Sequence, residues 1–118
     1  MRCEGEVLPM IEGLWIAQFE GLQGHGAGVV VFVNGRALGG DEAFTYVGHY
    51  KEEGGKMKAR ITVSNFRPEI GNVMGITGDF DLEITAPVGD GVVQGTMVLV
   101  GDPAGRSIAV KLTKKARL

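Results

Sequence analysis

The fold class is clearest in residues 56–64, which read KMKARITVS. Apolar side chains stand at every second position, at Met57, Ala59, Ile61 and Val63. Residues 80–84, FDLEI, repeat the pattern with Phe, Leu and Ile. Because successive side chains of a strand point to opposite faces, this period of two predicts two strands, each with one face in the core and one face in water.

Similar runs follow one another from residue 13 onward, separated by short connections rich in Gly, Asp, Asn and Pro. We expect about seven strands, over residues 14–20, 28–34, 43–51, 56–66, 79–86, 92–100 and 106–114. Residues 35–40 are assigned to a connection, and residues 24–28 to a hairpin turn. Connections this short join antiparallel neighbours, so the sheet is expected to be antiparallel.

The glycine content indicates how this sheet is arranged. Twenty glycines in 118 residues are more than twice the usual share of about 7%. Gly48 and Gly95 lie inside predicted strands, where glycine permits a bend or a bulge. An open sheet would expose two edges, whereas a barrel has none. We therefore expect an all-β fold, a small up-and-down antiparallel β-barrel of about seven or eight strands, with a two-sheet sandwich as the alternative.

The length and mass, 118 residues and 12.5 kDa, fit one domain. Residues 1–12 show no alternation and contain Pro9, so we expect a loosely ordered lead-in there and a single barrel domain over residues 13–118. Met10 is an alternative start of the chain.

Charge and cysteine content exclude several classes of partner. The formal net charge is -2 and the pI is about 5.6, without the basic excess that nucleic-acid binding requires. The basic side chains near the C-terminus are expected to form a solvated tail; they are Lys111, Lys114, Lys115 and Arg117. Cys3 is the single cysteine, and no apolar stretch approaches the ~18 residues of a membrane span. A cytoplasmic protein that binds neither nucleic acid nor membrane is therefore expected.

No catalytic motif stands out. The two serines, Ser64 and Ser107, lie in no nucleophile motif, and the histidines lack metal-ligand spacing. We expect no enzyme, no cofactor and no metal. The alternative is a mononuclear metal site formed by His25, His49 and Asp41, which would have to come together in the folded chain. The carboxylates of Asp79, Asp81 and Glu83 are expected to form a water-facing strand surface.

One predicted strand face is aromatic, with Phe44, Tyr46 and Tyr50 beside Gly48. Core filling is the expected role, because side chains can just fill a barrel of about eight strands. The alternative is a small apolar ligand inside the barrel. Its lining would come from Phe44, Tyr46, Met57, Ile61 and Val63.

The connection between two strong strands reads KEEGG over residues 51–55. Its carboxylates, Glu52 and Glu53, should project from the end of a hairpin. Such a tip is either a solvated turn or a contact for another protein.

A set of positions recurs in a characteristic order. They are Gly13-Leu14-Trp15, Phe19, Gly26-Ala27-Gly28-Val29-Val30, Gly35, Gly39-Gly40-Asp41, Tyr46-Val47-Gly48 and Tyr50. In order and spacing the chain resembles the GrlR family, named for a negative regulator of type III secretion genes in enteric pathogens. The resemblance is strongest over residues 13–63 and continues more weakly through Val73-Met74-Gly75 to about Leu112.

The resemblance implies a lipocalin-like barrel that forms a homodimer and has no known catalytic activity. It implies a regulatory role in which the barrel captures a protein partner, for the named member a transcriptional activator, through an acidic motif at a hairpin tip. The matching positions are Glu52 and Glu53, where the four acidic residues of that motif are reduced to two. We therefore expect a non-enzymatic regulatory binding protein; the alternative is a carrier or sensor of a small apolar ligand.

Overall fold

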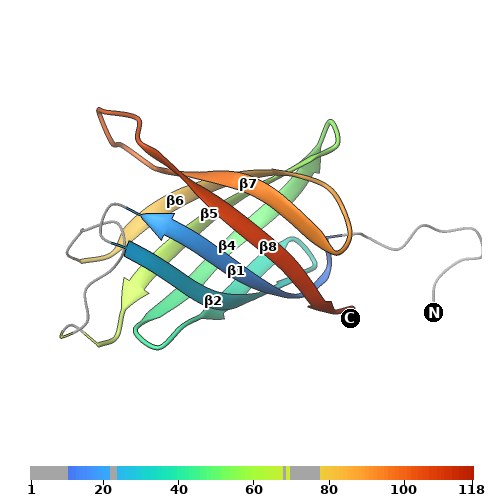
Figure 1. The fold of residues 1–118 in the computed structure, drawn as a ribbon, viewed down its shortest axis with the longest axis horizontal. Coiled ribbons are helices and arrows are strands. Elements are labelled where there is room, and N and C mark those ends of the chain that lie inside the picture. Colours follow the sequence, from blue (N-terminus) through green and yellow to red (C-terminus); the bar gives the residue numbers. More distant parts are fainter. Residues whose placement is uncertain (1–10, 22–23, 68, 70–77) are drawn as a thin grey trace, which may run out of the picture.

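The computed structural model describes residues 11–21, 24–67, 69 and 78–118, which form a closed antiparallel β-barrel (Figure 1). The strands are β1 (Gly13–Gly21), β2 (Gly24–Val33), β3 (Arg36–Gly40), β4 (Phe44–Glu53), β5 (Lys56–Asn65), β6 (Phe80–Pro87), β7 (Val92–Leu99) and β8 (Ser107–Ala116). Most of the expected lead-in, with Cys3 and Met10, lies outside the described residues, as does the stretch 73–75.

The barrel is up-and-down, as predicted. Each strand pairs with its neighbours in the sequence, and β1 also pairs with β8, which closes the sheet. The β1–β8 pairing runs from Leu14 opposite Ala116 to Phe19 opposite Val110, with one shift in register between Leu14 and Trp15. Within the described part of the chain, no helix is long and apolar enough to span a membrane.

Two sequence assignments were wrong, and both concern glycine-rich segments. Residues 36–40 are not a connection but strand β3, in which Leu38 pairs with Val31 on one side and Val47 on the other. Residues 24–28 are not a turn but the start of β2, and Gly26 pairs with Phe19 of β1. Glycine lowers strand propensity, but pairing supplies the backbone hydrogen bonds that hold each segment extended, with β2 and β4 for residues 36–40 and with β1 for residues 24–28.

The predicted faces of β5 are confirmed. Met57, Ala59, Ile61 and Val63 are all buried, while the side chains between them are exposed. Gly48 of β4 also faces inward, and a Cβ there would lie 1.9 Å from the carbonyl oxygen of Arg60. The β4–β5 register passes through Gly48 without a shift. Glycine is therefore required for close approach of the two strands and not for a bulge.

One end of the barrel, which we call the plugged end, is filled by Trp15 and Ile11. The Trp15 indole Nε1 donates a hydrogen bond to the backbone oxygen of Ile11 at 2.7 Å. Phe32 contacts the Trp15 ring edge-on at 6.4 Å between centroids and the Tyr50 ring at 5.2 Å. These aromatic contacts leave a void of only about 10 Å³ at this end.

The basic C-terminal cluster is only partly a solvated tail. Lys111 and Lys115 are exposed, as expected. The side chain of Lys114 is only 8% exposed, and its ammonium group lies 3.2 Å from an Asp90 carboxylate oxygen and 5.1 Å from the centre of the Trp15 ring. Arg117 also pairs with Asp90, at 3.3 Å. A run of basic residues in the sequence does not show which lysine is buried, because the aliphatic stem of any lysine packs readily on apolar surface.

Candidate functional site

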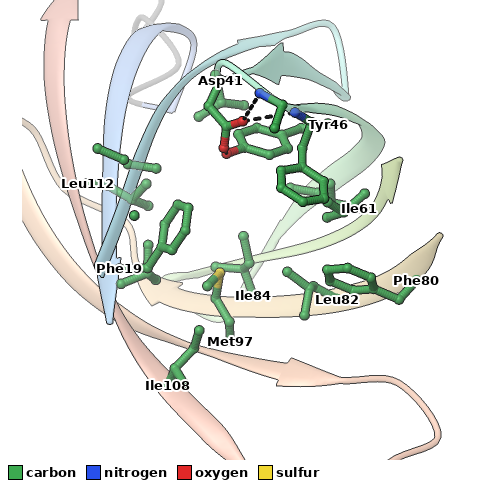
Figure 2. A pocket seen from close by; sticks show the side chains of 18 of the residues that line it. Phe19, Asp41, Tyr46, Ile61, Phe80, Leu82, Ile84, Met97, Ile108 and Leu112 are labelled. Atoms are coloured by element: carbon green, nitrogen blue, oxygen red, sulfur yellow. Dashed lines mark hydrogen bonds between the residues drawn. The ribbon is translucent and has the colours of Figure 1, made fainter. Parts of the chain in front are cut away.

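The barrel interior contains an apolar cavity of about 170 Å³. Figure 2 shows its walls, built from inward-facing side chains such as Phe19, Leu82, Ile84 and Met97. The cavity reaches the end of the barrel opposite the Trp15 plug, where the β3–β4 connection contributes its polar edge. The pleat of each strand explains this lining, because every second side chain points inward.

Four of the five predicted lining residues border this cavity. They are Phe44, Tyr46, Ile61 and Val63. The fifth, Met57, instead lies beside Trp15 and Phe32 at the plugged end. Met57 shares the inward face but sits near the start of β5, opposite Ala86. Alternation identifies the face of a residue but not its depth along the barrel axis.

The polar edge of the cavity is a pair formed by Asp41 and Tyr46. The Tyr46 hydroxyl donates a hydrogen bond to Asp41 Oδ2 at 2.5 Å. Asp41 Oδ1 accepts two further hydrogen bonds, from the backbone N–H groups of Ala43 and Phe44, both at 2.9 Å. A carboxylate that accepts from the backbone two and three residues onward is the usual way in which Asp stabilises a tight turn. The β3–β4 turn therefore fixes the carboxylate beside the tyrosine.

Burial raises the pKa of the Tyr46 hydroxyl, and both the hydrogen bond to Asp41 and the negative charge of Asp41 raise it further. All three effects disfavour the phenolate. The hydroxyl therefore keeps its proton across the physiological pH range and remains a donor to Asp41.

Two glycines of β2 make room for the aromatic side chains of the cavity. A Cβ at Gly28 would lie 2.6 Å from the Tyr46 hydroxyl oxygen, and one at Gly26 would lie 2.4 Å from the Phe19 ring. The glycine run at the start of β2 thus lets both rings lie directly against the strand backbone.

The structure does not assemble the His25, His49 and Asp41 site. His49 is exposed on the outward face of β4, whereas Tyr46, the partner of Asp41, points inward from the same strand. The side chain of His25 is not among those that the structure describes. Across the described residues, no group of three or more His, Cys, Asp or Glu side chains could hold a metal ion.

Of the three carboxylates predicted to face water, Asp79 is exposed just before β6, while Asp81 and Glu83 of β6 are engaged with the neighbouring strand. Asp81 accepts a hydrogen bond from the Thr62 hydroxyl at 2.7 Å, and Arg60 lies between Asp81 and Glu83 at 3.5 and 3.9 Å. These cross-strand pairs describe a solvated outer surface rather than an acid–base site.

Glu52 and Glu53 lie, as expected, at the exposed end of the β4–β5 hairpin. Gly54 and Gly55 form its turn, with positive φ angles of 61° and 79° that favour glycine. Glu53 contacts Lys58 at 3.0 Å and Lys51 at 3.4 Å, and these lysines lower its pKa.

The charge of this tip is mixed rather than acidic. Three lysines surround its two glutamates: Lys51, Lys56 and Lys58. Glu53 is engaged by two of them, while Glu52 has no ion pair within the described residues. Both carboxylates are exposed, but Glu53 is already paired with two lysines, whereas Glu52 is not.

Comparison with known proteins gives no further assignment, because no protein-family model and no curated protein matches the chain.

Proposed function

We propose that the protein is a cytoplasmic, non-enzymatic regulatory binding protein of the GrlR type, which captures a protein partner through its exposed hairpin tips. The observation that carries this proposal is the shape of the β4–β5 hairpin. The last pair between β3 and β4 is Arg36 with His49, so residues 50–53 of β4 extend past the end of β3. Figure 1 shows this hairpin end, in green, projecting beyond its neighbours.

Within this mixed charge, the Glu52 carboxylate offers a contact for a basic side chain of the partner. Glu52 supplies an exposed carboxylate, while the Lys51–Glu53–Lys58 pairs hold the strand ends around it. A transcriptional activator, and a role in type III secretion, belong to this proposal through the family resemblance.

Charge reversal at the tip tests the proposal. A photo-crosslinking residue at position 52 should trap a defined partner in the native cell, and Glu52→Lys should remove that partner from purified complexes. Glu83→Lys is the matched control, because Glu83 is an exposed carboxylate on the barrel wall. Loss of the partner in both variants, or in neither, would contradict the assignment to the tip.

We also propose that the protein forms a homodimer, with the outer face of β1–β4 as its interface. Six of the outward positions there are apolar and adjacent in register: Leu14, Ile16, Val29, Val31, Leu38 and Val47. Val29 and Val47 are each 47% exposed.

The cavity favours a second candidate function, binding of a small apolar ligand. Its walls are apolar and its edge carries one polar pair, the usual composition of a ligand site. Native mass spectrometry of protein purified without added ligand tests this function. A bound mass that is lost on denaturation would support it, and an adduct-free protein that also binds no small aromatic probe would contradict it.

A further inference from the structure

We propose that the cavity selects compact apolar molecules that carry a hydrogen-bond donor and no negative charge, with the donor directed at Asp41 and Tyr46. This inference rests on the second candidate function, ligand binding inside the barrel, and adds the chemical class of the ligand.

The polar edge of the cavity offers hydrogen-bond acceptors only. A phenol has one hydrogen, and Tyr46 gives it to Asp41 Oδ2, so the Tyr46 oxygen can only accept. Asp41 is an acceptor with capacity for about four hydrogen bonds, of which three are made, to Ala43, Phe44 and Tyr46. A bound molecule is therefore matched to this edge by an O–H or N–H group.

The charge of the cavity edge disfavours anions. Asp41 lines the cavity, and the exposed Glu42 borders the same edge. An anionic ligand would place a negative charge beside the partly buried Asp41 carboxylate, where electrostatic repulsion is screened less than at the surface. A carboxylate ligand, such as a fatty acid, is therefore disfavoured, whereas an alcohol, phenol or amine is accepted.

The size of the cavity limits the ligand. The volume of about 170 Å³ is close to that of an engineered protein cavity of about 150 Å³ that binds benzene. It is smaller than the ~300 Å³ at which ordinary ligand pockets begin. The cavity therefore fits one six-membered ring with a short substituent, against walls that include Phe19, Phe80 and Met97.

Four probes that share one ring test the proposal: toluene, benzyl alcohol, benzylamine and benzoate. Each is titrated into the isotope-labelled full chain, and dissociation constants are measured from amide chemical shifts. We expect benzyl alcohol to bind about fivefold more tightly than toluene, the effect of one net hydrogen bond. Benzylamine, which is a cation at pH 7, should also bind more tightly than toluene, through its attraction to the Asp41 carboxylate. Benzoate should not bind.

Two variants locate the site. Asp41→Asn removes the charge and places an N–H donor at the edge, so the preference for benzylamine over toluene should disappear. Ile108→Phe should weaken all probes by filling the cavity, because Ile108 lines it. Thr96→Phe adds the same ring on the exposed face of β7 and should leave binding unchanged.

The outcomes distinguish ligand binding in the cavity from the preference for hydrogen-bond donors. If no probe shifts cavity residues, both the ligand-binding function and the donor preference are wrong. If toluene and benzoate bind as tightly as benzyl alcohol, and Ile108→Phe still weakens them, the cavity is a ligand site but its proposed selectivity is wrong. An Asp41→Asn protein that retains the wild-type spectrum and the wild-type preference overturns the role of Asp41.

Discussion

The ammonium group of Lys114 lies over the Trp15 ring, 5.1 Å from its centre, and also 3.2 Å from the carboxylate of Asp90. Trp15 belongs to β1 and plugs one end of the barrel, whereas Lys114 belongs to β8, the strand that closes the barrel onto β1. Asp90 lies in the connection between β6 and β7. Lys114 therefore ties three separate parts of the plugged end together.

Replacing Lys114 by Met should destabilise the barrel while keeping the aliphatic stem. We expect a loss of about 1–2 kcal/mol in the free energy of unfolding, since a largely desolvated cation–π contact contributes up to about 2 kcal/mol. Urea denaturation at pH 7 measures this loss. Lys115→Met is the matched control, because the neighbouring side chain is exposed and should change stability by less than about 0.5 kcal/mol. Equal effects of the two substitutions would show that Lys114 acts only through net charge.

The Asp90 carboxylate should make part of this stability dependent on pH. The hydrogen bond from Lys114, then the backbone N–H of Gly91, and the positive charges of Lys114 and Arg117 hold its pKa below the ordinary value of 3.8. A folded-state pKa below the unfolded one stabilises the fold above pH 4, and this contribution is lost as pH falls through the folded-state value. Asp90→Asn should therefore lower the urea midpoint at pH 7, and the difference from wild type should shrink toward pH 3. A difference that stays constant over this range would contradict the electrostatic account.

The fold could be predicted wherever one strand face is buried and the other is exposed to solvent, as on β5 and β6. Strand β3 could not, because its sequence, Arg36–Gly40, has one strongly apolar side chain and ends in two glycines. Its extended conformation depends on pairing with β2 and β4, and the sequence of residues 36–40 does not show where those strands lie. Such a strand can be inferred from the number of strands that a closed barrel requires, but not from its own residue pattern.

The site was predicted in part for a related reason. Burial of Phe44, Tyr46, Ile61 and Val63 follows from alternation, and all four line the cavity. The partnership of Asp41 with Tyr46 depends on how the β3–β4 turn folds back. The available signal was Asp41, two residues before the predicted strand 43–51, a position from which its carboxylate commonly accepts backbone hydrogen bonds in a turn.

Gly48→Ala should be among the most damaging single-methyl additions to the barrel. The new Cβ would lie 1.9 Å from a backbone oxygen, that of Arg60, so relief requires the β4 and β5 backbones to separate. Overpacking of this kind costs about 3 kcal/mol, which calorimetry would record as a lower Tm. His49→Ala, at the exposed neighbouring position, should have little effect. A Gly48→Ala protein with the wild-type Tm would mean that the strands are not held this closely.

Val29→Lys should dissociate the proposed homodimer, because it places a charge in the centre of the apolar outer face of β1–β4. Val29 is 47% exposed in the single chain, so the substitution should leave the monomer folded. Light scattering coupled to size exclusion at micromolar concentration should give twice the chain mass for wild type and the chain mass for Val29→Lys. Thr85→Lys, on the exposed face of β6, should remain dimeric. A monomeric wild type would remove the dimer altogether, whereas a dimeric Val29→Lys protein would place the interface elsewhere on the barrel.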